Sequence, residues 1–438
     1  MAVKKVVYYQ HPEVGNYHYG RFHPMKPQRL NACNSLICSY GLDKKLMVVE
    51  SPRLTYEEMT NFHSREYIDF LRKISPNSAE AMESQFASFN FGEDCPVFEG
   101  IYDYCTIYAG GSVEGAKRLN HEYNDIVINW PGGLHHAKKN KASGFCYVND
   151  IVLGILELLK YHKRVLYIDI DIHHGDGVQE AFNNSDRVMT ASFHRFGGTF
   201  FPGTGNILDK GFDQGKYFAI NVPFFSGVGD EDYHSVFQPV ISAIMQNFDP
   251  EAVVLQCGAD SLGEDRIGCF NLSFDGHARC VEYVKSFKRR MLVVGGGGYT
   301  LRNVARCWAN ETAVCLGLDI PDKIPDSSEY YQFFAPNFTL RPTLKVKVPN
   351  ENTKEYLAMI RNELLETLAM VKGAPSVQFY NPPGSRLEEI EILEDNDKRS
   401  AGDFEDVMPE RTEQLRPHGR GGKRGSRGVR GAHKAIRD

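Results

Sequence analysis

Short apolar runs alternate with longer segments of mixed polarity along most of the chain. Four of these runs occupy positions 126–128, 165–168, 252–255 and 291–294, and they contain only Ile, Val, Leu, Met, Ala and Tyr. A continuous apolar run of this length is typical of a strand buried on both faces, as in a parallel sheet. The pattern predicts a single α/β domain over residues 1–380, with a central, mainly parallel sheet flanked by helices.

Several of the longer segments carry apolar residues at helical spacing. Asn149 is a good N-cap, and the apolar positions 151, 152, 155, 158 and 159 after it predict a helix that ends near His162. Two further core-facing helices are predicted at 236–248 and 356–368. The first nine residues predict a strand and not a secretory signal, because their apolar part is too short.

A polar or glycine-rich motif follows each of the four apolar runs. Parallel strands end at a common edge, and open α/β proteins bind ligands beyond the carboxyl ends of their strands. We therefore expect the four motifs to form one site. They are Pro-Gly-Gly-Leu-His-His (131–136), Asp-Ile-Asp-Ile-His-His-Gly-Asp (169–176), Gly-Ala-Asp (258–260) and Gly-Gly-Gly-Gly-Tyr (295–299).

The second motif predicts a metal site. If the strand continues past Ile168, its alternation points Asp169, Asp171 and His173 to one face. Such groups are costly to bury unless they are paired or bind a metal, and Asp260 can complete the set from a neighbouring strand end. Two aspartates and one histidine leave a coordination position open, as in a catalytic zinc site, and ferrous iron accepts the same ligands.

Composition agrees with a large intracellular domain. The chain has 438 residues, and its 42% hydrophobic content is enough for a sizeable core. Ten cysteines are scattered without a Cys-x-x-Cys pair, which argues against a cysteine-rich zinc site and predicts a reduced compartment. No apolar run approaches the length of a membrane span.

Charge is concentrated at the end of the chain. Residues 411–438 hold nine Lys or Arg and two acids, a net of +7, so the rest carries −13 of the overall −6. An acidic body suits a basic partner, although ordinary solubility is the commoner reason for such a charge. Residues 381–438 are predicted to be a disordered tail, acidic and then Gly/Arg-rich, that binds nucleic acid, serves nuclear import or is merely solvated.

The motifs resemble those of a class I histone deacetylase over nearly all of residues 3–380. The resemblance implies the arginase/deacetylase fold, with a central parallel sheet of about eight strands. The matching segments, in order, are 19–20 with 23–27, 94–97, 132–139, 143–147, 173–178, 201–205, 258–262 and 295–299.

This resemblance implies hydrolysis of N-ε-acetyl-lysine in histone tails by a single zinc ion. It assigns zinc to Asp171, His173 and Asp260, which the spacing had already selected. It implies that paired histidines activate water and protonate the leaving amine, without deciding which one does which, and that a tyrosine stabilises the oxyanion. These residues, with the carboxylate partners of the histidines, are His135, His136, Asp169, Asp176 and Tyr299.

Further sites are implied by the resemblance alone. Substrate binding is implied for Asp94, Gly144, Phe145, Phe201 and Ile267. One potassium ion is implied near Asp169, Asp171, His173, Ser192 and Phe193, and a second near Phe182, Ser185 and Val188. A regulatory inositol phosphate is implied at His18, Lys26, Arg266 and Arg302. The implied partners are acetylated histone tails and corepressor subunits, in the nucleus or also in the cytoplasm, with no membrane and with nucleic acid contact through the tail.

Some positions depart from the family pattern. Arg21 and Phe22 stand where the family usually has Ala-Gly beside the channel, which puts inositol phosphate binding and inhibitor selectivity in doubt. Lys141, Asn34, residues 224–229 and residues 309–310 also differ, but none of them is an expected metal ligand. They indicate a divergent member with an intact reaction centre.

Three other functions compete with this interpretation. A di-manganese ureohydrolase would need a second acidic cluster, and Asp260 has no acidic partner two residues further on. A deacylase of small amines such as polyamines would share the same metal centre and differ only at the rim. A catalytically silent corepressor scaffold would have no physical need for the complete set of site residues.

Overall fold

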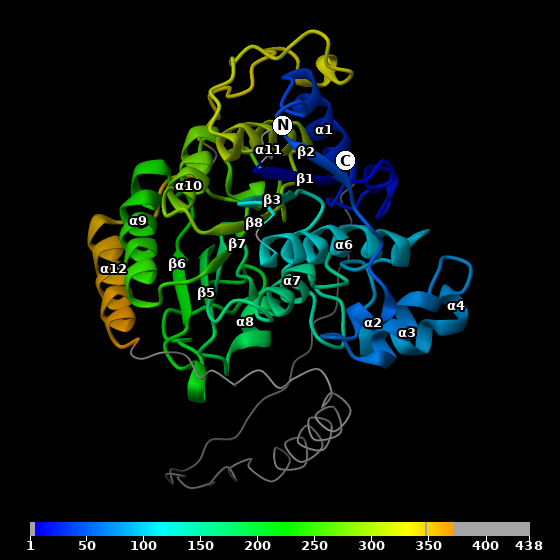
Figure 1. Cartoon of the computed structure of the whole chain (residues 1–438), viewed down its shortest axis with the longest axis horizontal. Coiled ribbons are helices and arrows are strands. Elements are labelled where there is room, and N and C mark those ends of the chain that lie inside the picture. The colour runs from blue at the N-terminus through cyan, green and yellow to red at the C-terminus, as the bar shows by residue number, and fades with distance from the viewer. Residues whose placement is uncertain (1–4, 122, 347, 372–438) are drawn as a thin grey trace, which may run out of the picture. The chain divides into compact units, whose positions relative to one another are not determined.

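An eight-stranded sheet, parallel throughout, forms the centre of the protein (Figure 1). The structure is a computed structural model, and it describes residues 5–121, 123–346 and 348–371. The predicted α/β class with a central parallel sheet is confirmed. The strands, in the spatial order β2-β1-β3-β8-β7-β4-β5-β6, are β1 (Val6–Gln10), β2 (Met47–Glu50), β3 (Ile126–Asn129), β4 (Val165–Asp169), β5 (Val188–Arg195), β6 (Ala219–Phe224), β7 (Ala252–Gln256) and β8 (Arg290–Val294).

Helices cover both faces of this sheet (Figure 1). The bounds of the helices among the described residues are α1 (Gln28–Ser39), α2 (Tyr56–Met59), α3 (Arg65–Lys73), α4 (Ala79–Met82), α5 (Phe86–Phe89), α6 (Ile101–Asn120), α7 (Asp150–Leu158), α8 (Asp176–Phe182), α9 (Asp230–Asn247), α10 (Phe274–Ser286), α11 (Leu301–Leu316) and α12 (Lys354–Ala369). The helices predicted after Asn149, at 236–248 and at 356–368 are α7, the second half of α9 and most of α12.

Alternate residues of each strand contribute to opposite layers of core. Val7, Val127 and Val254 pack with the buried residues of α6, α7 and α8. Their neighbours Val6 and Ile128 belong to the larger core on the other side of the sheet, which also takes residues of α1, α9, α10 and α11. Because successive side chains point to opposite faces, a strand between two helical layers must be apolar at every position, as these runs are.

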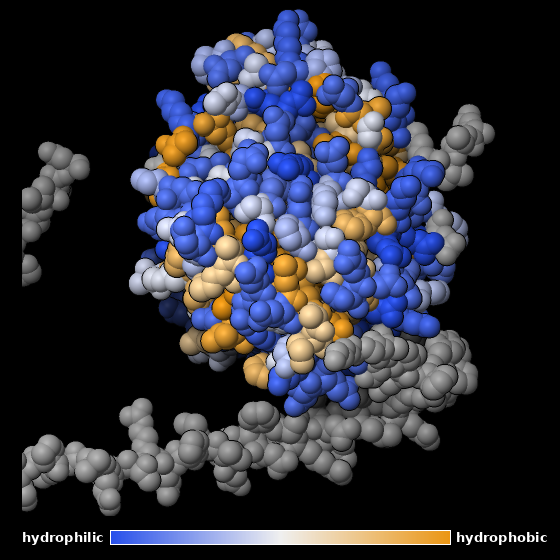
Figure 2. All heavy atoms as spheres, turned by 90° about the vertical axis from the view of Figure 1, so that its left-hand side faces the viewer, coloured by the Kyte–Doolittle hydropathy of each residue, from blue (hydrophilic) through white to orange (hydrophobic). Residues whose placement is uncertain are grey.

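The face that carries α9 and α12 is largely hydrophilic, with smaller hydrophobic areas between the polar side chains (Figure 2). In the described part of the chain no helix combines the length and the apolar character that crossing a membrane requires. All ten cysteines are free thiols, and most of them are buried. The predicted tail and its boundary at residue 380 lie outside the described residues.

The four strands that precede the sequence motifs are neighbours in the sheet. Their order is β3-β8-β7-β4, and each pair is parallel and in continuous register. The motif at 131–136 therefore begins beside that at 295–299, and the motif at 258–260 lies between the latter and 169–176. This order is what brings segments up to about 170 residues apart to one edge.

A buried histidine anchors the start of α7 next to this edge. The His63 Nδ1 donates to the Lys139 carbonyl oxygen over 3.1 Å, and its Nε2 accepts the Asn149 N–H over 2.9 Å. The Asn149 side chain in turn caps α7 by accepting the Val152 N–H, as predicted. Burial lowers the pKa of His63 to about 4. The bond from the Asn149 N–H also needs the lone pair of Nε2, which the protonated ring does not have.

We expect His63 to make the protein less stable in mild acid. The unfolded chain binds the His63 proton near pH 6.5 and the folded chain only near pH 4, so stability is lost as pH falls between these values. Between pH 7 and pH 5 the loss is about 2 kcal/mol. Urea unfolding at both pH values measures it. His63→Gln, whose amide can donate and accept without titrating, should remove this part of the pH dependence; identical pH dependence in both proteins would refute the assignment.

Candidate metal and catalytic site

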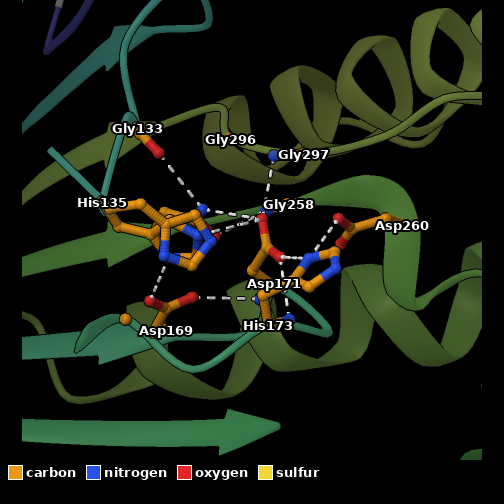
Figure 3. A network of polar contacts seen from close by, with 12 residues as sticks. Gly133, His135, Asp169, Asp171, His173, Gly258, Asp260, Gly296 and Gly297 are labelled. Carbon is orange, nitrogen blue, oxygen red and sulfur yellow. Dashed lines mark hydrogen bonds and ion pairs between the residues drawn. The ribbon is translucent and has the colours of Figure 1, made fainter. Parts of the chain in front are cut away.

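The three predicted ligand residues form one buried cluster (Figure 3). The His173 Nδ1 lies 3.0 Å from Asp171 Oδ1 and 3.2 Å from Asp260 Oδ2, so that the ring is held between two carboxylates. Candidate ligand atoms of the three residues all lie within 4.8 Å of one another. Asp260 comes from the turn after β7, and the other two come from the segment after β4.

The predicted reason for this convergence is wrong in one respect. We expected a strand continuing past Ile168, but β4 ends at Asp169 and the chain bends over the next residues. Within the bend the Asp169 carboxylate accepts the Asp171 N–H over 3.1 Å, and Asp171 accepts the His173 N–H over 3.0 Å. Side-chain to backbone bonds two residues apart, and not strand alternation, therefore set the positions of these groups.

Neighbouring loops hold the Asp171 carboxylate from its other side. Its Oδ2 accepts the Gly297 N–H over 2.8 Å and the Gln256 Nε2 over 2.9 Å. The glycine run at 295–298 is thus more than a turn, since its backbone reaches this carboxylate directly. A Cβ at Gly297 would lie only 2.0 Å from Asp260 Oδ2.

The electrostatics of this cluster fit a divalent cation. Burial and the nearby Asp171 raise the pKa of Asp260 to about 7. Burial alone would lower the pKa of His173, but its bonds to the two carboxylates raise it to about 10, so a proton on the ring balances the buried negative charge. A divalent cation can replace that proton, and two carboxylates with one neutral imidazole are a suitable donor set for zinc or ferrous iron.

The paired histidines each rest on a carboxylate. The His135 Nδ1 donates to Asp169 over 2.7 Å, and the His136 Nδ1 donates to Asp176 over 2.6 Å. Tyr167 also donates to Asp169, over 2.5 Å. Because Nδ1 carries the proton in both rings, the two Nε2 atoms are the ones free to exchange protons elsewhere.

The two histidines differ in charge. Burial opposes a charge on His135, but Asp169 and Asp171 outweigh it and raise the pKa of His135 to about 9. Burial and the positive His135 lower the pKa of His136 to about 3. With no metal ion bound, one ring is therefore protonated and the other neutral at pH 7. For Asp176, burial is outweighed by its hydrogen bond to His136 and by the positive Lys138, which lower the pKa of this carboxyl.

Tyr299 follows the glycine run and is buried next to the cluster. Its N–H donates to Asp265 over 2.7 Å, and its ring meets that of Phe145 edge-on at 5.8 Å. Burial and the negative charges of Asp260 and Asp171 raise the pKa of the Tyr299 hydroxyl well above its usual value, so it keeps its proton and can donate it in a hydrogen bond.

Two aromatic rings flank the cluster. The Phe201 ring lies edge-on to that of His136 at 4.9 Å and is 41% exposed, while Phe145 lies beside Tyr299. Asp94 is exposed and accepts the Gly144 N–H over 3.0 Å, which places it beside Phe145. Ile267 donates its N–H to Asp265, the residue that also holds Tyr299.

The other predicted site residues fall into three groups. Ser192 and Phe193 lie on β5, where Ser192 is in register with Asp169. Phe182, Ser185 and Val188 lie where α8 turns into β5. Lys26 donates to the Gly20 and Arg21 carbonyl oxygens, and proximity to Arg266 contributes to a lowered pKa of Lys26. His18 accepts the Gly20 N–H two residues on, and Arg302 donates to the Ala335 carbonyl oxygen, 33 residues further along the chain.

Sequence reasoning missed three residues that hold the site in place. Gln256 is the polar end of an otherwise apolar run, a signal that was available. Arg29 donates to the Gly298 and Gly296 carbonyl oxygens over 2.7 and 2.5 Å, with its guanidinium 4.9 Å from the Trp308 ring. Asp265 accepts four backbone N–H groups, from Ile267, Gly268, Tyr299 and Thr300. Nothing in the local sequence distinguishes Arg29 or Asp265 from other charged residues.

Comparison with known proteins gives consistent matches. Residues 23–315 match the family model described as histone deacetylase domain. The chain is 62% identical over 396 residues to "Putative histone deacetylase 2" of Caenorhabditis elegans, covering 90% of this chain and 78% of that protein. It is 49% identical over 445 residues to histone deacetylase HDAC1 of Drosophila melanogaster, covering 99% of this chain and 84% of that protein.

Proposed function

Because the chain belongs to the histone deacetylase family, as a class I member, we propose that it hydrolyses N-ε-acetyl-lysine in histone tails to lysine and acetate, and thereby acts in chromatin repression. The observation that carries the proposal is the single buried cluster of Asp171, His173 and Asp260 with two carboxylate-paired histidines and a tyrosine around it. All these groups lie at one edge of the sheet.

The cluster of Asp171, His173 and Asp260 would hold a zinc ion. When bound, zinc would act as a Lewis acid toward the acetyl carbonyl and would lower the pKa of a coordinated water. Amide hydrolysis also needs a base to take a proton from water and an acid to give one to the departing amine. The chain supplies both functions from the His135–His136 pair.

The different pKa values of the two histidines indicate which one is the general base and which one is the general acid. His136, neutral at pH 7, can accept a proton at Nε2 while Asp176 fixes its tautomer through Nδ1. His135, whose Nδ1 is held by Asp169, would place a positive charge near the oxyanion when protonated and could give up that proton. The Tyr299 hydroxyl donates a hydrogen bond to the oxyanion.

This division predicts unequal effects for the two histidines. We expect His136→Ala to lower kcat by about 100-fold to 10,000-fold, as loss of a general base does, and by at least about tenfold more than His135→Ala. Steady-state kinetics on an acetyl-lysine peptide, with zinc content measured for both variants, checks the order. A larger loss in His135→Ala at equal zinc content would assign the base to His135.

Phe145 and Phe201 support selection of a thin apolar stem. Two aromatic rings on either side of the cluster suit the methylenes of a lysine whose charge is masked by the acetyl group. Gly144 between them would contact the substrate through its backbone, and Ile267 would lie at the rim. The exposed Asp94 carboxylate would accept backbone N–H groups of an extended peptide.

Potassium and inositol phosphate extend the proposal. The carboxylate and carbonyl oxygens around Asp169, Ser192 and Phe193, and those of the α8–β5 turn, are ligands that a hard monovalent cation accepts. Burial and the nearby Arg266 lower the pKa of Lys26, so two cationic side chains lie near each other, which supports a phosphate between them. Corepressor subunits and nuclear location are proposed from the family, and nucleic acid contact from the basic tail, which lies outside the described residues.

The experiment that tests the function is turnover of an acetylated histone-tail peptide by zinc-loaded protein, with an acetylated polyamine as a competing substrate. Peptide hydrolysis with little polyamine turnover supports the proposal. Turnover of the polyamine alone would assign a small-amine deacylase instead. A folded, zinc-bound protein that hydrolyses neither substrate, alone or with added inositol phosphate, would favour the scaffold.

A further inference from the structure

A second cluster of ionisable side chains lies between α10 and α11, next to the Gly258 turn, and has no part in the proposed chemistry. His277 on α10 and Glu311 on α11 are fully buried, and the His277 Nδ1 is 2.5 Å from Glu311 Oε1. The Cys307 Sγ is 3.4 Å from the same nitrogen. Isolated buried charges are costly, and a buried ion pair is generally no better for stability than a well-packed apolar pair. Stability alone therefore does not explain why His277 and Glu311 are buried together.

The other ring nitrogen of His277 faces the site. Its Nε2 lies 2.9 Å from the carbonyl oxygen of Gly258, the residue two positions before Asp260. A carbonyl oxygen can only accept, so Nε2 must carry a proton. The short contact at Nδ1 holds a second proton between the ring and Glu311. The ring is thereby held by directional bonds at both ends, from one helix to the next and on to the loop.

Gly258 is in close contact with the ligand cluster. A Cβ at this position would lie 2.1 Å from Asp171 Oδ2, so the backbone here is packed against that carboxylate. The Gly258 N–H donates to Gln256 Oε1 over 2.8 Å, and Gln256 donates to Asp171. The Gly258 carbonyl also accepts the Ser261 hydroxyl over 3.2 Å, but Ser261 belongs to the same turn and cannot tie it to the helices.

We propose that His277 and Glu311 are positioning residues for the metal site: they fix the Gly258 carbonyl and hence the turn that presents Asp260. Residues that do not themselves bind a metal often set the orientation of those that do, by hydrogen-bonding to them or to their loop. The inference rests on the proposed function in taking Asp260 as a zinc ligand. It does not require that the substrate be a histone.

Zinc affinity of the full chain, measured by competition with a chelator, tests the inference. His277→Phe keeps the ring volume and removes both N–H donors, and we expect zinc to bind about 10-fold to 100-fold more weakly. Glu311→Leu leaves the ring free to turn, and we expect a loss of about tenfold. Glu311→Gln should stay within about threefold of wild type, because an amide can bond Nδ1 in either protonation state.

A matched control separates positioning from general destabilisation. Asn120 is buried at the end of α6, away from the site, and its Nδ2 donates to the Glu157 carbonyl oxygen over 2.9 Å. Asn120→Leu also removes a buried bond to a backbone carbonyl, so it should lower the thermal midpoint without changing zinc affinity. Equal zinc loss in this variant would overturn the inference, as would wild-type affinity in a folded His277→Phe.

Two further outcomes are decisive. If His277→Phe does not fold, the Glu311→Leu and Glu311→Gln pair carries the test, and equal zinc affinity in the two would overturn the inference. His277, Cys307 and Glu311 are themselves close enough to hold a metal. Two zinc ions per wild-type chain, falling to one in Glu311→Leu, would replace the positioning role with a second metal site. If the wild-type protein binds zinc but does not hydrolyse acetyl-lysine, the proposed function is contradicted. The zinc affinities of the variants would still test the positioning role.

Discussion

Asp260→Asn should abolish most of the activity, with a loss of about 1,000-fold or more in turnover of an acetyl-lysine peptide. The change keeps the shape of the side chain and removes one of the two negative charges that would balance the zinc ion. The carboxylate oxygens accept from the Ile172 N–H over 3.0 Å and from His173 over 3.2 Å, so an amide at this position can still bond the backbone. The fold is therefore expected to survive the loss of metal.

Zinc content and kcat, measured on the same preparation, check this prediction. A surface control is Asp249→Asn, which removes the charge that pairs with Arg164 and Arg289 at the surface. It should change neither quantity, since surface ion pairs contribute little. The expected loss is equivalent to about 4 kcal/mol of transition-state stabilisation, within the range for Lewis-acid assistance. Full activity in a metal-free Asp260→Asn protein would show that the reaction does not need the metal.

Tyr299→Phe should lower kcat by about 100-fold to 1,000-fold while zinc remains bound. Burial and the nearby carboxylates keep the hydroxyl protonated. In the proposed mechanism it donates to the oxyanion, and loss of one such donor has this magnitude. The backbone bond of Tyr299 to Asp265 and its edge-on contact with Phe145 do not involve the hydroxyl. We therefore expect KM and thermal stability to change little.

The measurement is kcat and KM on one peptide, with zinc content as a check on the site. Tyr161→Phe is the matched control, because Tyr161 is 58% exposed just beyond the C-terminal end of α7 and loses the same hydroxyl. A rise in KM with unchanged kcat would make Tyr299 a binding residue and not an oxyanion donor. Loss of zinc from Tyr299→Phe would instead assign it a role in the metal site.

The strands were predictable because their burial leaves no choice of residue type. Each strand near the centre of the sheet lies between two helical layers, so runs such as 252–255 and 291–294 must be apolar throughout. The start of α7 was predictable for a similar reason, since Asn149 both caps the helix and bonds locally. Both predictions depend only on burial and on contacts between residues close together in the sequence.

The candidate site was predictable in part. The four motifs follow four strands, and parallel strands end together, so their meeting at one edge follows from the pattern. The path of the chain after Asp169 did not follow from it, because a bend held by side-chain to backbone bonds replaces the expected strand. The roles of the individual residues, potassium, inositol phosphate and the domain boundary stay predictions.

The sequence by itself determined the fold class, the central strands, three of the helices and the set of polar residues that gather at the carboxyl edge. These depend on periodicity and on what each residue type can bury. Only the tertiary structure decided the strand order that makes β3, β8, β7 and β4 neighbours, and with it the long-range contacts of Arg29, Gln256 and the His277–Glu311 pair. Those contacts join residues up to 269 positions apart. Local propensity carries no information on which distant carbonyl or carboxylate a buried donor will reach, since packing of the whole core selects it.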